Sequence, residues 1–125
     1  MSEEIDAGAE LARRFDQLEP VKAAFWLKGS GSPHRFLYIA PERIDAGDLA
    51  AAYGEVLRIV GEMRSPALNP FRIKLIPADD PLAQAAAEIQ GRFPGRMPTR
   101  LGEGIFGGMG VDDVYVYPSR LPALT

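Results

Sequence analysis

The chain has 125 residues, of which 46% are hydrophobic and 25% are charged, and its formal net charge is -3. These values are typical of one ordinary folded domain, which can bury enough surface to fold without a disulfide or a metal. The sequence contains no cysteine, which excludes a disulfide framework and thiolate chemistry, and its net charge argues against attraction of nucleic acid to the whole surface. The acidic opening MSEEIDAGAE lacks the apolar region of a signal peptide, so we expect a cytoplasmic protein without a membrane span.

The first 40 residues are predicted to form a helix followed by a hairpin. Residues 3–18 carry apolar side chains at helical spacing, and Pro20 disfavours helix at the residue before it. The apolar segments 21–28 and 34–40 flank the sequence GSGSP, which is rich in turn-forming residues. We therefore expect these two segments to pair as antiparallel strands.

The middle of the chain is predicted to form a second helix and a third strand. Residues 45–63 carry the most sustained helical stripe in the sequence, and Asp45 or Asp48 could cap its start. Residues 71–76 alternate apolar and basic side chains, which is the pattern of a strand covered on one face. The two expected sides are Phe71, Ile73 and Leu75 toward the helices and Arg72 and Lys74 away from them.

The last third is predicted to form a third helix and a final strand. Asp80 is placed as the N-cap of a helix that starts with Pro81, and Gly91 is placed to end it. The buried stripe of this helix is expected to consist of Leu82, Ala85, Ala86 and Ile89. Residues 111–118 form a strand with valines on one face and tyrosines on the other.

These elements predict one α+β domain over residues 1–125, with two or three layers and the order α-β-β-α-β-α-β. The sheet is expected to be mainly antiparallel, with helices packed on it. Residues 117–125 are expected to be a tail on the surface.

The segment LGEGIFGGMG contains the pattern G-x-G-x-x-G at Gly102, Gly104 and Gly107. A dinucleotide-binding loop needs a strand before these glycines and a helix after them, because the helix N-terminus binds the pyrophosphate. Here a proline-containing segment precedes them and a strand pattern follows. A protein kinase needs a lysine and two catalytic acids after its loop, but none of the 15 residues after Gly110 is lysine. The pattern therefore predicts neither kind of nucleotide site.

Three other interpretations of the glycines remain open, and one of them is plain mobility of the segment. In the first, Gly107 and Gly108 adopt positive φ in a hairpin turn, so that 105–106 pair back with 111–116. In the second, bare backbone N–H groups and nearby arginines bind an anion. The candidate residues of this loop, which spans 92–110, are Arg96, Arg100, Gly102, Gly104, Gly107 and Gly108.

A second candidate site follows from strand parity. The residues that would share the outer sheet face are Trp26, Arg72, Lys74, Tyr115 and Tyr117, with Lys22 and Lys28 beside them. Aromatic rings among cations could stack nucleic-acid bases or form a protein interface. Alternatively the first helix covers this face and the rings belong to the core.

The remaining polar residues point to no catalytic set. His34 is the single histidine, and it lies in the expected turn beside serines, where local hydrogen bonding is its expected role. Asp112 and Asp113 are neighbours on a strand and therefore point to opposite faces, so they do not form one metal site by themselves.

The sequence therefore favours a non-enzymatic domain without a cofactor, acting by association with itself or with a protein partner. The expected contacts are the sheet face and the loop 92–110. One alternative is a single-stranded nucleic-acid binder that uses the basic and aromatic face. The other is an enzyme or sensor for a small anionic metabolite bound at the glycines.

Overall fold

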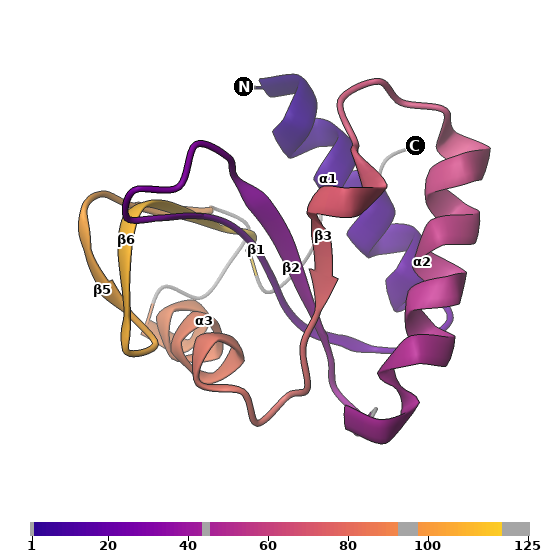
Figure 1. Cartoon of the computed structure of the whole chain (residues 1–125). Helices are drawn as coiled ribbons and strands as arrows, with labels where there is room; N and C mark the ends of the chain where they lie inside the picture. Colours follow the sequence, from indigo (N-terminus) through magenta and orange to yellow (C-terminus); the bar gives the residue numbers. More distant parts are fainter. Residues whose placement is uncertain (1, 44–45, 93–97, 119–125) are drawn as a thin grey trace.

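A computed structural model of the chain describes residues 2–43, 46–92 and 98–118 (Figure 1). Three α-helices, six strands and two short 3-10 helices (η1 and η2) make up this part of the chain. In order they are α1 (Ser2–Asp16), β1 (Val21–Gly29), β2 (Phe36–Pro41), η1 (Ala46–Asp48), α2 (Leu49–Met63), η2 (Pro70–Arg72), β3 (Ile73–Leu75), α3 (Pro81–Arg92), β4 (Thr99–Leu101), β5 (Gly104–Phe106) and β6 (Met109–Val116).

The strands form one mixed sheet in the order β3-β2-β1-β6-β4, and β5 pairs with β6. β1 and β2 form the predicted antiparallel hairpin. The expectation of a mainly antiparallel sheet is partly wrong because β2 and β3 are parallel. A parallel pair needs a long connection between its strands, and α2 provides it. The predicted element order also lacked β4 and β5, which are three residues long each.

The helices cover the sheet from both sides, which makes three layers (Figure 1). α1 and α2 lie on one face, and α3 lies on the other. The side chains of β1 alternate between the two resulting cores: Trp26 points into the core under α1 and α2, and Phe25 points into the core under α3. Because both faces of its central strands are covered, the sheet carries apolar residues on both sides.

α1 is held against the sheet by a buried hydrogen-bonded chain. The indole Nε1 of Trp26 donates to the Tyr117 hydroxyl at 2.9 Å, and that hydroxyl donates to the carbonyl of Ile5 at 2.5 Å. Gly8 leaves room for this chain, since a Cβ at that position would lie 2.4 Å from the Tyr117 hydroxyl oxygen. Tyr117 is therefore a core residue, and the predicted surface tail cannot begin there. Residues 119–125 lie outside the part that the structure describes.

α2 begins at Leu49 rather than at residue 45 and ends at Met63 as predicted; its C-cap residue, Arg64, adopts the left-handed conformation with φ of 52°. The N-cap residue is Asp48, but its side chain makes no capping hydrogen bond, and Asp45 lies outside the described residues. The residues that α2 buries are Ala52, Val56, Ile59 and Val60. Its apolar stripe is wider than this buried face, so part of the stripe lies outside the core.

α3 begins as predicted, because Asp80 Oδ1 accepts a hydrogen bond from the backbone N–H of Leu82 at 2.8 Å. The helix continues past Gly91 to Arg92, so the predicted end is wrong by one residue. Ala83 and Ala86 are its buried residues. The other members of the predicted stripe, Leu82, Ala85 and Ile89, are partly buried against the same core.

β3 is shorter than the predicted strand. Ile73 packs in the core under α1 and α2, and Leu75 is partly buried against it. Phe71 was expected on that buried side, but it lies in η2 and its relative exposure is 87%. The cause is local: the Asn69 side chain accepts a hydrogen bond from the Phe71 N–H at 2.9 Å and caps η2 there.

The glycine-rich segment forms a hairpin turn at the predicted glycines, but 105–106 pair with 109–110 rather than with 111–116. Gly107 and Gly108 have φ of 58° and 82°, and they join β5 to β6 with Phe106 paired to Met109. Gly107 also lies close to the start of α3, since a Cβ there would lie 2.9 Å from the carbonyl oxygen of Pro81. The hairpin interpretation therefore accounts for both of these glycines.

Candidate functional site

The sheet-face residues do not share one exposed surface. Trp26 is 5% exposed and Tyr117 is 2% exposed, because α1 covers both rings. Lys74 lies on the opposite face of the sheet, where its Nζ is 4.5 Å from the centre of the Phe36 ring. The expectation of a common outer face is therefore wrong for these three residues, and the core interpretation holds for the two rings.

Arg100, a cation predicted for the loop site, lies beside a carboxylate. Asp113 accepts hydrogen bonds from Arg35 at 3.0 Å and from Arg100 at 3.4 Å. Burial raises the pKa of Asp113, but the hydrogen bonds and charges of the two arginines outweigh this effect, so its pKa lies below the ordinary value. Arg100 also pairs across the sheet with the half-buried Tyr115. One carboxylate therefore offsets part of the positive charge expected for a ligand.

The adjacent acids of β6 act separately, as their parity predicted. Asp112 forms an ion pair with Lys28 at 2.8 Å, whereas Asp113 binds the two arginines. Over the described ranges 2–43, 46–92 and 98–118, no group of three His, Asp or Glu side chains is placed to hold a metal ion.

The loop 92–110 is only partly described. Arg96 lies outside the described residues, and Arg92 forms an ion pair with Glu88 at 2.6 Å within α3. Gly102 and Gly104 precede the hairpin turn made by Gly107 and Gly108. Because Arg100 lies against Asp113, the structure does not bring this arginine and the turn glycines into one anion site.

His34 has the local role that its turn predicted. Its backbone N–H donates to the Ser32 hydroxyl at 3.3 Å, and that hydroxyl donates to the His34 carbonyl at 3.1 Å. The ring is exposed, and its Nε2 lies 3.4 Å from an Arg72 nitrogen. A neighbouring guanidinium does not activate a histidine as a base, so this pair carries no catalytic dyad.

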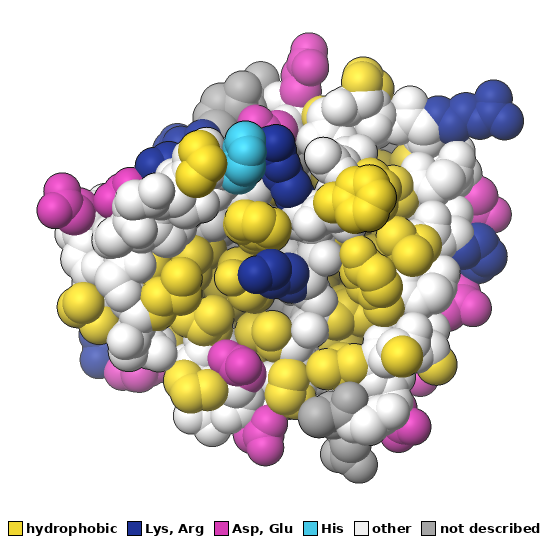
Figure 2. All heavy atoms as spheres, in the orientation of Figure 1, with side chains coloured by type: hydrophobic (Ala, Val, Ile, Leu, Met, Phe, Trp, Pro, Cys, Tyr) yellow, Lys and Arg dark blue, Asp and Glu magenta, His cyan; other side chains and the backbone are white. Residues whose placement is uncertain are grey.

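The structure instead reveals an apolar surface at the open edge of the sheet, where β3 is the last strand. We call it the open-edge surface, and it consists of Tyr53 and Leu57 of α2, Phe71 of η2, and Lys74 and Leu75 of β3. The Tyr53 hydroxyl donates to the carbonyl of Pro70 at 2.8 Å, which joins α2 to η2. Leu57 lies one turn along the same helix face and is 40% exposed. Figure 2 shows hydrophobic side chains spread across this side of the molecule with a cationic side chain among them.

Two features of the sequence conceal this surface. Phe71 fits the alternation of a strand, and only the cap made by Asn69 turns it out into solvent. The usable signal was in α2, where Tyr53 and Leu57 widen the apolar stripe beyond the face that the helix buries.

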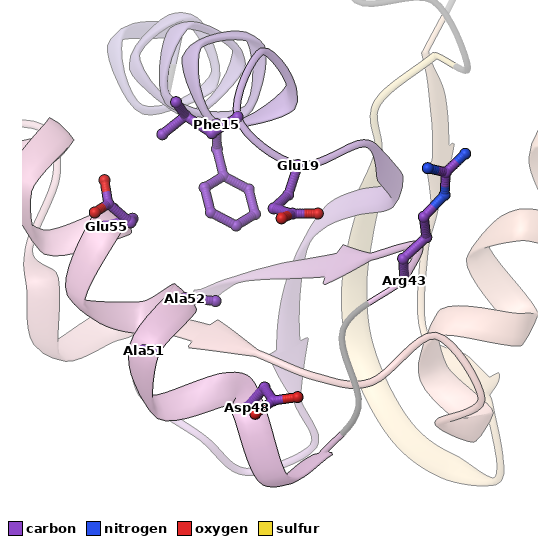
Figure 3. Close-up of a pocket in the computed structure, with 8 residues that line it drawn as sticks. Phe15, Glu19, Arg43, Asp48, Ala51, Ala52 and Glu55 are labelled. Atoms are coloured by element: carbon purple, nitrogen blue, oxygen red, sulfur yellow. The ribbon is translucent and has the colours of Figure 1, made fainter.

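A second feature is an open hollow of about 710 Å³ between the end of α1 and the start of α2 (Figure 3). In Figure 3 the Phe15 ring points from α1 toward Ala52 of α2. The polar residues around it are Glu19, Arg43, Asp48 and Glu55. The lining contains three carboxylates and one guanidinium, so the charge of the hollow would favour a cationic group over the anion that the sequence suggested.

Comparison of the chain with protein-family models, with curated proteins and with solved structures gives no match. Within the described residues, no helix has the length and apolar content needed to span a bilayer.

Proposed function

We propose that this domain functions by binding another protein through the open-edge surface. The observation that carries the proposal is the 87% exposure of Phe71 beside the edge strand β3. Phenylalanine is among the residues most often buried, and aromatic residues are enriched in the centres of protein interfaces. Apolar patches that remain exposed on a folded domain commonly mark interaction sites.

Burial of the Phe71 side chain by a partner would contribute substantially to the binding free energy. Full burial of a phenylalanine side chain contributes about 1.5–3 kcal/mol, which corresponds to roughly 10- to 150-fold in a dissociation constant. Nearly all of this contribution remains available at Phe71, because the fold itself covers little of its side chain.

Phe71 is also held in place before any partner binds. Its N–H is bound by Asn69, the N–H of Ile73 donates to the Pro70 carbonyl, and the same carbonyl accepts from Tyr53. A side chain on a fixed backbone loses less conformational entropy on binding. These contacts support η2 as a rigid anchor for the interface.

The contacts support this proposal better than the two alternatives. A nucleic-acid platform would stack bases on the aromatic rings of the sheet face, but α1 covers Trp26 and Tyr117, and Tyr115 is half-buried. Of the two arginines predicted for an anion site at the glycines, Arg100 lies against Asp113, and Arg96 lies outside the described residues. By contrast, nothing in the described part of the chain covers Phe71.

The test is photo-crosslinking in cells with p-benzoylphenylalanine placed at position 71. A matched control places it at position 105, because Ile105 is also an exposed apolar residue, at 77%, but lies on β5. We expect a discrete crosslinked protein from position 71 and none of the same mass from position 105. Equal crosslinking from both positions, or none from position 71, would contradict the proposal.

A second arm uses Phe71→Ser in the same cells, with a crosslinker at position 57. The substitution should leave the unfolding free energy within about 0.5 kcal/mol, because it changes an exposed side chain. It should nevertheless reduce the crosslink at least tenfold. A crosslink that survives Phe71→Ser would show that Phe71 is not the anchor.

A further inference from the structure

The backbone of β3 presents hydrogen-bonding groups that the sheet does not use. The N–H of Ile76 donates to the Ile39 carbonyl at 3.1 Å, so the backbone N–H of residue 76 points toward β2. The backbone N–H and C=O groups of successive strand residues point to opposite edges of the strand. Those of Lys74 therefore also point toward β2, and those of Ile73 and Leu75 point away from it. The N–H of Ile73 agrees with this pattern, since it turns back to Pro70.

Three groups are consequently left at the outer edge, namely the carbonyls of Ile73 and Leu75 and the N–H of Leu75. Among the strands of the described residues, β3 pairs with β2 alone, and Figure 1 shows α2 and α3 on its two sides. A free edge of this kind can accept an added strand from another chain, with backbone hydrogen bonds supplying affinity.

The same edge is protected against unselective pairing. It has only three residues, prolines stand at positions 70 and 77, and Lys74 is at its centre. Short strands, prolines and lysines are the features that natural sheets use to prevent edge-to-edge association. If two copies paired through β3 about Lys74, the two lysines would lie directly opposite each other, which is destabilising. The edge therefore disfavours a second copy of this chain.

The positive charge of Lys74 also favours partner strands that carry an acidic residue. Its Nζ lies over the Phe36 ring at 4.5 Å, and the ion pairs found among the described residues do not include it. Arg72 and His34 lie at the beginning of the same edge. An acidic residue across from Lys74 would form the opposite-charge pair that stabilises neighbouring strands.

We infer that the partner contributes an extended segment that adds to the outer edge of β3, with an acidic residue across from Lys74. Its alternate side chains are apolar and lie on the α2 side of the sheet, next to Leu57 and Phe71. This inference rests on the proposed function and specifies the chemistry of the partner.

The first test uses peptides as probes of the full chain, followed by NMR of its backbone amides. The probe is a terminally blocked seven-residue peptide of alternating Val and Glu, at up to about 1 mM. It should shift the amides of residues 72–76 and of β2. One matched peptide has Lys in place of Glu, and a second has methyl groups on alternate backbone nitrogens. We expect both matched peptides to bind at least tenfold more weakly.

The second test changes the edge itself. Leu75→Pro removes the one outward N–H and keeps the bonds to β2, because proline is tolerated on an edge strand where its nitrogen faces solvent. Leu75→Ala is the matched control, since it also loses the leucine side chain but retains the N–H. We expect Leu75→Pro to bind the Val-Glu peptide at least tenfold more weakly than Leu75→Ala, with both variants giving folded spectra.

The outcomes separate this inference from the proposed function. No shift of the β3 amides, equal binding of the N-methylated peptide, or equal binding by the two Leu75 variants would overturn strand addition. A crosslink from position 71 would still support association in that event. A crosslink that joins two copies of this chain, and that Leu75→Pro abolishes, would overturn the acidic partner in favour of self-pairing.

Discussion

At the scale of single residues, Gly8 sets how closely α1 approaches the sheet. An alanine Cβ there would lie 2.4 Å from the Tyr117 hydroxyl oxygen and 2.9 Å from Trp26 Nε1. Both atoms are buried and hydrogen-bonded, so the helix itself must move. We expect Gly8→Ala to lower the free energy of unfolding by about 1–3 kcal/mol. Urea denaturation at neutral pH measures this change in the free energy of unfolding.

The control for this prediction is Gly54→Ala in α2. A Cβ at Gly54 meets nothing within 4 Å, so only helix propensity changes there. Alanine is better than glycine inside a helix by about 1 kcal/mol, and Gly54→Ala should therefore stabilise the protein. If Gly8→Ala stabilised it equally, the close packing of α1 on Tyr117 would be wrong.

Residue-level prediction from the sequence succeeded where the cause is local. Gly107 and Gly108 were expected at positive φ, because a tight hairpin turn demands that conformation whatever surrounds it. The sequence did not predict whether Trp26 and Tyr117 are buried. Strand parity gives a side chain a face, but whether a helix covers that face can depend on distant residues. Tyr117, for example, is covered by α1, in which its hydroxyl donates to the Ile5 carbonyl 112 positions away.

At the scale of elements, the β5–β6 hairpin depends on its contact with α3. A Cβ at Gly107 would lie 2.9 Å from both Leu82 Cα and the Pro81 carbonyl oxygen, so an alanine would be strained by φ and would also strike backbone. We expect Gly107→Ala to lower the melting temperature clearly more than Gly108→Ala. A Cβ at Gly108 meets open space, so there only the unfavourable φ acts, and such strain contributes about 1–3 kcal/mol.

Thermal unfolding followed by circular dichroism compares the two variants. Because the contact is with the first turn of α3, the amides of residues 82–84 should shift in Gly107→Ala and stay in place in Gly108→Ala. Equal melting temperatures for the two variants would contradict a close contact between the turn and α3.

The predictability of each element follows the length of its periodic signal. α1, α2, β1 and β2 repeat their pattern over enough residues to be found in the sequence. β4 and β5 have three residues each, and such segments show no period. The direction of β3 could not be predicted from its own residues, because pairing with β2 rather than with a later strand is set by how α2 packs.

At the scale of the whole molecule, buried tyrosines link stability to pH. Burial raises the pKa of Tyr117, Tyr115 and Tyr38 above the ordinary value of about 10. The unfolded chain therefore loses these protons at lower pH than the folded chain. Stability from this source is complete below about pH 10 and declines as the pH rises through that value.

Tyr117→Phe separates two consequences of this residue. At neutral pH it should cost about 1–3 kcal/mol, because the buried Trp26 Nε1–H loses its acceptor. Above pH 10 its stability should fall less steeply than that of the unchanged protein. Urea unfolding at about pH 8 and about pH 11 measures both effects, and parallel declines in the two proteins would contradict the role given to Tyr117.

The candidate site is likewise a property of the whole molecule. Phe71, Tyr53 and Leu57 were all visible in the sequence as apolar residues, and each fits a core position in its own segment. They become a surface because β3 is the last strand on its side of the sheet. Strand order is not encoded within any one segment, so the predicted sites fell on the glycines and the central strands instead.

The pairing of β1 with β6 has a consequence for how the protein is made. Phe25 pairs with Val116, and Tyr117 supplies the hydroxyl that holds α1, so the centre of the sheet joins an early segment to a late one. A ribosome must therefore release residue 117 before the sheet can close. Until then β1 lacks one neighbour and α1 lacks its anchor, which leaves apolar side chains open to chaperones during translation.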